Sequence, residues 1–124
     1  MSVRVLTVDD QARFRGVARD VIEATPGFET VGEAENGEEA LRAVERLGPE
    51  LVLLDVRMPG IDGIEVARRL TLTHPDTLVV LVTIEDPLDL PSAAQLGAVP
   101  LVRKQDFGPS LLRRLWSEHG LSSA

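Results

Sequence analysis

Runs of consecutive aliphatic residues alternate along the chain with longer stretches in which apolar residues recur every three or four positions. An aliphatic run without polar interruption is typical of a strand covered on both faces, whereas the longer spacing predicts an amphipathic helix. The pattern predicts five strands, at Val3–Val8, Phe28–Ala34, Leu51–Asp55, Leu78–Thr83 and Val99–Val102. Strands and helices therefore alternate along the whole chain.

A helix is predicted after each strand. Asp10 or Gln11 can cap the first helix and Asn36 the second. Prolines confine the fourth helix to about Ser92–Leu96, because proline is tolerated only in the first turn of a helix. The positions expected to face the sheet in the other four helices are Phe14, Val17, Ala18, Val21 and Ile22, then Ala40, Leu41, Ala43, Val44 and Leu47, then Ile64, Ala67 and Leu70, and finally Leu111, Leu112, Leu115 and Trp116.

Alternation of strands and helices with short connections predicts an α/β fold with a doubly wound, five-stranded parallel sheet. We expect the flavodoxin-like strand order 2-1-3-4-5. Polar residues interrupt Phe28–Ala34, and Pro100 lies within the last predicted strand, so both of these strands are placed at the edges of the sheet.

Polar side chains stand where four of the predicted strands end. They are Asp9, Asp10, Asp55, Thr83 and Lys104. The carboxyl ends of parallel strands meet at one edge of the sheet, which is where open α/β sheets bind ligands. An aspartate such as Asp55 can also serve only to begin a turn. The expected presence of the other four polar residues at the same edge favours a functional site over this alternative.

Three carboxylates in one crevice repel one another, so they require positive charge. Lys104 provides one such charge, and Mg²⁺ suits the remainder because it prefers carboxylate oxygens together with phosphate oxygens. Asp55 can then act as the nucleophile that accepts a phosphoryl group. The sequence has neither of the glycine-rich motifs that mark dinucleotide and P-loop sites after its first strand.

Composition narrows the class of protein further. A chain of 124 residues with 44% hydrophobic residues fits one domain, which we place at residues 1–120, followed by a tail at 121–124. The net charge of −7 and the scattered basic residues argue against direct nucleic-acid binding. With no cysteine, no apolar run of membrane-spanning length and no secretory signal, we expect a cytoplasmic protein that does not associate with membranes.

Taken together, these residues resemble the receiver domain of bacterial two-component response regulators over the whole chain. The motifs that match are VDD at Val8–Asp10, LLDVRMPGIDG at Leu53–Gly63, Thr83 and Lys104. The resemblance implies a domain that takes a phosphoryl group from a histidine kinase and signals to an output protein, as a monomer or a homodimer. It implies no enzymatic activity beyond its own phosphorylation and dephosphorylation.

The same resemblance implies a role for each residue of the site. Asp55 is the phosphoacceptor, and Thr83 and Lys104 contact the phosphoryl group. Mg²⁺ is held by the carboxylates of Asp9, Asp10 and Asp55 and by the backbone carbonyl of Arg57. Arg57 and Glu85 are expected to flank the route of the attacking water, where their opposite charges can pair.

Three positions depart from the family pattern. Gln105 replaces a common proline, as in receivers that accompany helix-turn-helix DNA-binding domains; we nevertheless expect a stand-alone receiver. Ile84 is bulky where a small residue is usual, and Leu101 replaces a switching aromatic residue. We therefore expect phosphorylation to order residues 84–96 instead of turning a side chain at Leu101.

Two other functions remain as alternatives. A receiver-like interaction module that is never phosphorylated agrees with Ile84 and Leu101, although such a module has no need of the acidic pair and Lys104. A phosphatase of the haloacid-dehalogenase type also uses an aspartyl nucleophile, but it requires two acids separated by one residue after the first strand. Asp9 and Asp10 are adjacent, which argues against this phosphatase.

Overall fold

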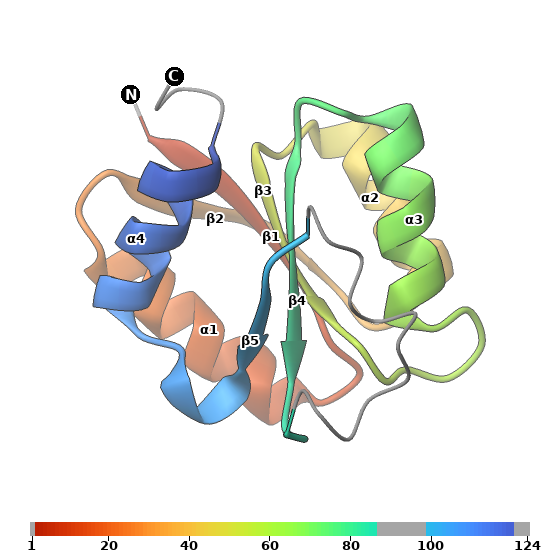
Figure 1. Ribbon diagram of the computed structural model, residues 1–124, viewed down its shortest axis with the longest axis horizontal. Coiled ribbons are helices and arrows are strands. Elements are labelled where there is room, and N and C mark those ends of the chain that lie inside the picture. The colour runs from red at the N-terminus through yellow and green to blue at the C-terminus, as the bar shows by residue number, and fades with distance from the viewer. Residues whose placement is uncertain (1, 87–98, 121–124) are drawn as a thin grey trace.

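Five parallel strands form one sheet in the computed structural model, which describes residues 2–86 and 99–120 (Figure 1). The strands are β1 (Val3–Val8), β2 (Phe28–Ala34), β3 (Leu51–Asp55), β4 (Leu78–Thr83) and β5 (Leu101–Arg103). The helices in the described residues are α1 (Ala12–Ala24), α2 (Gly37–Leu47), α3 (Gly63–Thr73), α4 (Pro109–His119) and the short 3₁₀ helix η3 (Lys104–Asp106).

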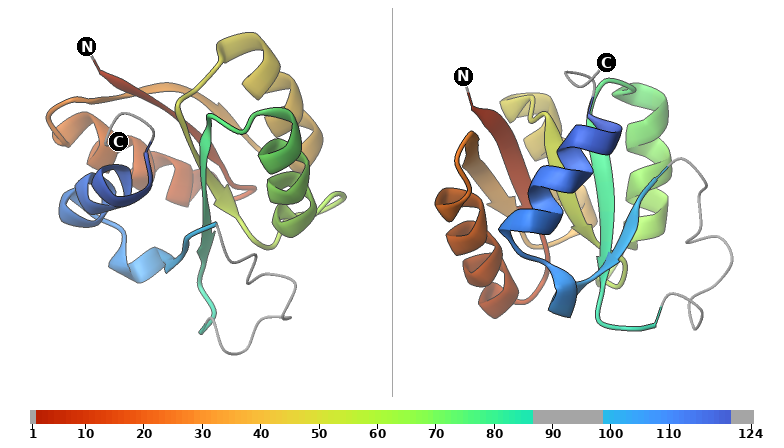
Figure 2. Two further views of the ribbon diagram at one scale, coloured as in Figure 1. Left: turned by 45° about the horizontal axis from the view of Figure 1, so that its top comes forward. Right: turned by 60° about the vertical axis from the view of Figure 1, so that its left-hand side comes forward.

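The strand order is β2-β1-β3-β4-β5, so the predicted topology and both predicted edge strands are confirmed. Helices α1 and α4 cover one face of the sheet, and α2 and α3 cover the other (Figures 1 and 2). The order reverses between β1 and β3, which pair directly from Val5 with Leu51 to Val8 with Leu54. The crevice of a doubly wound sheet lies at this reversal, beyond the carboxyl ends of the two strands.

The hydrophobic core is divided by the sheet into two layers. Successive side chains of a strand point to opposite faces, so Val52 and Leu54 of β3 pack toward α2 and α3, while Leu51 and Leu53 pack toward α1 and α4. All four side chains are buried, as a central strand covered on both faces requires. The β3 strand is thereby held rigidly up to Asp55, its last residue.

Side-chain and backbone caps fix several helix ends. Asn36 accepts a hydrogen bond from the Glu39 amide at 2.9 Å, as predicted, and α2 ends at Gly48 in the left-handed region, with φ 57°. Asp62 caps α3 in the same manner, which the sequence analysis did not predict. Gln11 occupies the cap position of α1 but makes no capping bond through its side chain.

Some sequence predictions need correction. Val17 does not face the sheet: it is 49% exposed, because its place on α1 falls outside the stripe centred on Ala18 and Ile22. The last strand spans Leu101–Arg103 and not Val99–Val102, because Pro100 has no N–H and contributes only a carbonyl, which accepts from the Leu81 amide at 2.9 Å.

The predicted helix at Ser92–Leu96 and the tail at 121–124 lie outside the described residues. Most of the segment expected to become ordered on phosphorylation, 84–96, lies outside them too. Within residues 2–86 and 99–120, no helix combines the length and the apolar character that a membrane span requires.

Candidate functional site

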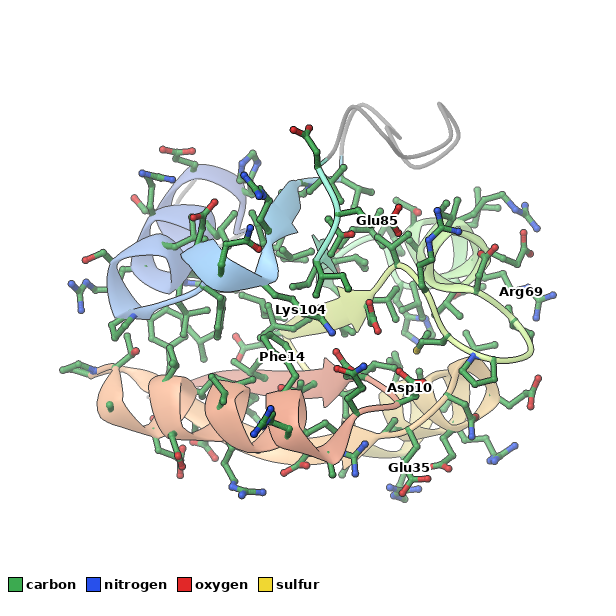
Figure 3. All side chains as sticks on the ribbon, turned by 90° about the horizontal axis from the view of Figure 1, so that it is seen from below. Asp10, Phe14, Glu35, Arg69, Glu85 and Lys104 are labelled. Carbon is green, nitrogen blue, oxygen red and sulfur yellow. The ribbon has the colours of Figure 1, made fainter. Side chains whose placement is uncertain are left out.

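The carboxyl edge of the sheet brings all five predicted polar residues into one region. Asp10 and Lys104 of this set are labelled in Figure 3. Asp9 and Asp10 directly follow β1, Asp55 and Thr83 are the last residues of β3 and β4, and Lys104 begins η3 directly after β5. A cavity of about 160 Å³ opens here. Its lining residues are Asp10, Gln11, Asp55, Arg57, Thr83, Ile84, Glu85 and Lys104. Asp9 is buried next to this cavity.

The three aspartates form one cluster, with a carboxylate oxygen from each within 4.8 Å of the others. Asp9 and Asp55 are buried, whereas Asp10 is exposed. Like charges at this separation repel one another, and burial strengthens the repulsion. The cluster is therefore a site that a cation would stabilise.

Lys104 is the basic residue that faces this cluster. Its ammonium lies 2.6 Å from Oδ2 of Asp9 and 3.6 Å from Oδ2 of Asp55. It also lies 4.7 Å from the centre of the Phe14 ring, within the range of a cation–π interaction (Figure 3). The Phe14 ring in turn contacts Phe107 at a centroid distance of 6.2 Å. The lysine is thus held between carboxylates and an aromatic pair.

Asp9 is fixed through almost every polar atom it has. Its amide donates to the Ala34 carbonyl at 3.0 Å, and its Oδ1 accepts from the Gln11 amide at 2.8 Å. Its Oδ2 is in ionic contact with Lys104, but it receives no directed hydrogen bond from the described part of the chain. A buried carboxylate oxygen without a directed donor is a suitable partner for an ion or an ordered water.

The donor set fits a hard divalent cation. Three carboxylates and no nitrogen or sulfur ligand make up the cluster, and oxygen ligands of this kind suit Mg²⁺. Asp10 adds accessible oxygens at the rim: among residues 2–86 and 99–120, no side chain forms an ion pair with it. The residues present therefore fit the metal that the sequence analysis predicted.

The environment of Asp55 disfavours its charged form. Burial raises the pKa of Asp55 from 3.8 to about 6, and the negative charges of Asp9 and Asp10 act in the same direction. Lys104 and the Arg57 amide, which donates to Oδ1 at 3.3 Å, oppose this shift. A cation bound at the cluster would lower the pKa of Asp55 further, in the same direction as Lys104 and the Arg57 amide, and return it toward its ordinary value.

Thr83 and Ile84 line the wall of the cavity at the end of β4. The Thr83 hydroxyl oxygen accepts a hydrogen bond from the Glu85 amide at 3.0 Å, so its proton stays available for donation. Ile84 lines the same cavity but is 69% exposed, which leaves most of its side chain in solvent. The cavity of about 160 Å³ is therefore present even with this bulky residue in its wall.

Arg57 and Glu85 form an ion pair on the rim of this cavity, which confirms that these two residues can pair. The Arg57 guanidinium contacts both carboxylate oxygens of Glu85, with Nη2 at 3.2 Å from Oε2. This hydrogen bonding lowers the pKa of Glu85 and raises that of Arg57. The pair joins the β3–α3 loop to the segment after β4.

The loop between β3 and α3 is closed by a contact between Gly63, the first residue of α3, and Val56, the first residue after Asp55. The Gly63 amide donates to the Val56 carbonyl at 2.9 Å, and a Cβ at Gly63 would overlap the Asp55 carbonyl. Gly60 within the loop has φ 76°, in the left-handed region that favours glycine. Two glycines are therefore required for the conformation of the loop that follows the phosphoacceptor candidate.

Sequence reasoning did not assign Phe14 or Arg15 to the site. Phe14 was expected to face the sheet, and Arg15 lies outside the positions expected to do so. In the structure Arg15 is mostly buried, and its Nη1 donates to the Asp9 carbonyl at 2.7 Å. A contact between an α1 side chain and a loop carbonyl leaves no trace in the hydrophobic pattern, because periodicity reports only which face of a helix is apolar.

Comparisons with known proteins agree with this architecture. Residues 5–115 match the family model described as "Response regulator receiver domain". "Response regulator GacA" of Pseudomonas viridiflava is 45% identical over 87 residues, which cover 68% of this chain and 41% of the relative. A "Protein-glutamate methylesterase/protein-glutamine glutaminase" of Halalkalibacterium halodurans is 39% identical over 104 residues, which cover 82% of this chain and 30% of the relative. The chain thus spans less than half the length of these curated relatives.

Solved structures agree as well. The response regulator domain of Thermotoga maritima CheB superimposes with a TM-score of 0.78 at 28% identity, covering 93% of this chain and 94% of that domain. The signal receiver domain of the putative response regulator NarL from Mycobacterium tuberculosis also gives 0.78, at 32% identity, covering 92% and 96%. Fold, family match and relatives together show that the chain belongs to the response regulator receiver family of two-component systems.

Proposed function

We propose that this chain is a phosphoaccepting receiver, which takes a phosphoryl group from a histidine kinase onto Asp55 in the presence of Mg²⁺. The observation that carries the proposal is the convergence of Asp9, Asp10 and Asp55, whose carboxylate oxygens lie within 4.8 Å of one another beside the Lys104 ammonium. A receiver that only bound a partner would have no use for a buried acidic cluster, which destabilises the folded chain.

Mg²⁺ would be held by carboxylates of Asp9, Asp10 and Asp55 and by the backbone carbonyl of Arg57. When bound, it neutralises charge on the phosphoryl oxygens during transfer. Arg57 also orients the acceptor, because its amide donates to Oδ1 of Asp55. That bond leaves Oδ2, which faces Lys104, as the oxygen available for attack.

In the transfer itself, a carboxylate oxygen of Asp55 forms a bond to phosphorus while the bond from phosphorus to the histidine nitrogen of the kinase breaks. The leaving nitrogen keeps the electron pair. Lys104 compensates the charge of the phosphoryl group, and the Thr83 hydroxyl donates a hydrogen bond to one of its oxygens. Catalysis of this kind consists of positioning and electrostatic stabilisation.

We further infer that the receiver domain extends over residues 1–120, acts in the cytoplasm and signals to an output protein through a conformational change, alone or as a homodimer. It has no catalytic cycle beyond its own phosphorylation and dephosphorylation. The net charge of −7 supports an output through protein contacts and not through direct DNA binding. Because the curated relatives are longer than this chain, output activities such as those named for them are not attributed to the receiver itself.

The proposal is tested by incubating the protein with Mg²⁺ and a small phosphodonor and measuring its intact mass. We expect the mass of one phosphoryl group to be added, and Asp55→Asn to abolish the gain. Asp62→Asn, which alters the cap of α3 in the adjacent loop, serves as the control and should still be phosphorylated. If the unmodified protein gains no mass while it binds Mg²⁺, the alternative of an unphosphorylated interaction module takes its place.

A further inference from the structure

Arg15 of α1 reaches from its helix to the loop that carries the acidic pair. Nη1 donates to the Asp9 carbonyl at 2.7 Å, and Nε donates to Oε1 of Glu33 at 3.3 Å. Nη2 lies 3.8 Å from Oε1 of Glu35. The Arg15 side chain is 14% exposed, so most of its length is packed against neighbouring atoms.

The guanidinium therefore connects three places in the fold. Glu33 lies in β2, Glu35 follows that strand, and the Asp9 carbonyl belongs to the peptide that joins Asp9 to Asp10. A planar guanidinium with several fixed donors can hold a carboxylate and a carbonyl at the same time, which the single ammonium of a lysine does less well. The direction of the Asp9–Asp10 peptide is thus set partly by a side chain anchored in the edge strand.

That peptide determines where Asp10 presents its carboxylate. No ion pair or hydrogen bond in the described part of the chain restrains the exposed Asp10 side chain directly. Its placement within 4.8 Å of the oxygens of Asp9 and Asp55 therefore depends on the backbone. The Asp9 side of this backbone is held at the amide by Ala34, and at the carbonyl by Arg15.

We propose that Arg15 is the positioning residue for divalent-cation binding: it orients the Asp9–Asp10 peptide, and Glu33 holds Arg15 in the orientation that this requires. The inference rests on the proposed function, because it concerns the cation that phosphoryl transfer uses. Arg15 makes no contact with the cation itself; it acts through the backbone of the acidic pair.

A positioning role and a purely electrostatic role of Arg15 predict opposite changes in Mg²⁺ affinity. Arg15 is a cation near a cation site, so if only its charge mattered, neutralising it would strengthen Mg²⁺ binding. If it positions the acidic pair, replacing it weakens Mg²⁺ binding even when the charge is kept. Removing groups that orient metal ligands commonly weakens affinity by roughly 10- to 100-fold, and we expect about tenfold here because the contact is to backbone.

The structure offers a matched control in Arg19. Arg19 also lies on α1 and donates to Glu33, at 2.8 Å to Oε2, but it is 51% exposed and is not bonded to Asp9. Arg15→Lys and Arg19→Lys both preserve charge and both disturb the Glu33 network. Only Arg15→Lys loses the geometry of the bond to the Asp9 carbonyl.

The experiment is a Mg²⁺ titration of the full chain without phosphodonor, followed by calorimetry and by the amide resonances of residues 9, 10 and 55. We expect about tenfold weaker binding for Arg15→Lys, weaker binding still for Arg15→Gln, and affinity within twofold of the parent for Arg19→Lys. Glu33→Gln, which loosens the anchor of Arg15, is expected to weaken binding by a smaller factor and serves as the second variant if Arg15→Lys or Arg15→Gln fails to fold.

Two results would overturn the inference: unchanged or tighter Mg²⁺ binding in the Arg15 variants, or equal losses for Arg15→Lys and Arg19→Lys. Failure of the proposed function gives a different result, because the parent protein itself would then bind no Mg²⁺ or accept no phosphoryl group. Phosphorylation of Asp55 in the parent, with unchanged affinity in Arg15→Lys, would leave the function in place and remove only the role of Arg15.

Discussion

The Lys104 ammonium lies 4.7 Å from the centre of the Phe14 ring and 2.6 Å from Oδ2 of Asp9. The ring face carries partial negative charge and attracts the ammonium, so Phe14 limits the positions that Lys104 can take. Phe14 is itself half-buried against the core layer between the sheet and helices α1 and α4. Lys104 is therefore held in place before any phosphoryl group arrives.

We expect Phe14→Leu to slow phosphorylation by a small phosphodonor by roughly two- to fivefold, the loss that a partly buried cation–π contact implies. The reason is that Lys104 gains conformational freedom that it must lose again in the transfer step. Phe107→Leu is the matched control, because Phe107 packs on Phe14. Both variants should lower the free energy of unfolding by about 1 kcal/mol, but only Phe14→Leu should change the rate of phosphorylation. Equal rates in the two variants would assign Phe14 to the core alone.

The pH dependence of the free energy of unfolding should show that burial destabilises the ionised form of Asp55. Its pKa is about 6 in the folded chain and 3.8 in the unfolded reference, so between these values the folded state binds more protons. Stability without metal should therefore rise as the pH falls from about 6 toward about 4, and the ionised carboxylate should cost stability above pH 6.

Asp55→Asn removes this cost, so we expect it to raise the free energy of unfolding at pH 7.5 in metal-free buffer by about 1 to 2 kcal/mol, after allowance for solvent screening. The gain should disappear near pH 4. Denaturant unfolding at several pH values measures both effects, with Asp20→Asn on the exposed face of α1 as the control for net charge. A less stable Asn variant at pH 7.5 would show that Lys104 more than compensates the burial of Asp55.

Mg²⁺ binding should depend on Asp10 more than on Asp9. Asp9 is buried, its Oδ1 already accepts from the Gln11 amide and its Oδ2 is shared with Lys104, whereas the Asp10 carboxylate is exposed at the rim. We expect Asp10→Ala to weaken Mg²⁺ affinity more than tenfold, because losing a direct ligand should cost more than the roughly tenfold loss of a group that only orients one, and Asp20→Asn to leave it unchanged. Titration followed by amide resonances at residues 9, 10 and 55 provides the measurement. Unchanged affinity in Asp10→Ala would exclude this residue as a ligand.

The Arg57–Glu85 ion pair should affect how long the phosphoryl group survives. The pair stands at the rim of the cavity, so removing either partner opens the approach of water to Asp55. The pair is exposed, and contacts of this kind have small effects, so we expect Arg57→Ala and Glu85→Ala each to shorten the phosphoryl half-life by roughly two- to fivefold.

The double variant should resemble the single ones, because both act through one contact. Arg68→Ala breaks a comparable exposed pair with Glu65 on α3, away from the cavity, and should leave the half-life as it is. Half-lives that stay the same in Arg57→Ala and Glu85→Ala would mean that water reaches Asp55 by another route.

Hydrophobic periodicity predicted the first four strands, and the general topology of doubly wound sheets predicted the strand order and the edge at which Asp9, Asp55 and Thr83 meet. The same rules failed where an outcome depended on how far one side chain reaches. The long, charged side chain of Arg15 fits a solvated helix face in sequence, yet it crosses to the Asp9 carbonyl. Val17 has the spacing of a core residue but lies outside the narrow buried stripe of α1.

Asp62 is a related case. The motif at Leu53–Gly63 includes Asp62, but only the structure shows that its side chain caps α3 by accepting from the Glu65 amide. A turn residue and an N-cap share the same preferred types, so sequence alone cannot separate them. The beginning of α3 matters for the site because it closes the loop that leaves Asp55.

The overlap that any Cβ at Gly63 would make with the Asp55 carbonyl has a consequence for genetics. Every substitution at Gly63 must displace the backbone of Asp55 and Val56 or the start of α3. In a random-mutagenesis screen for lost signalling, Gly63 should therefore be hit as often as Asp55, although it has no group that reacts or binds charge. A map of loss-of-function mutations will therefore mark Gly63 as if it took part in the chemistry. Only a phosphorylation assay on purified variants that still fold will distinguish the structural role of Gly63 from the proposed acceptor role of Asp55.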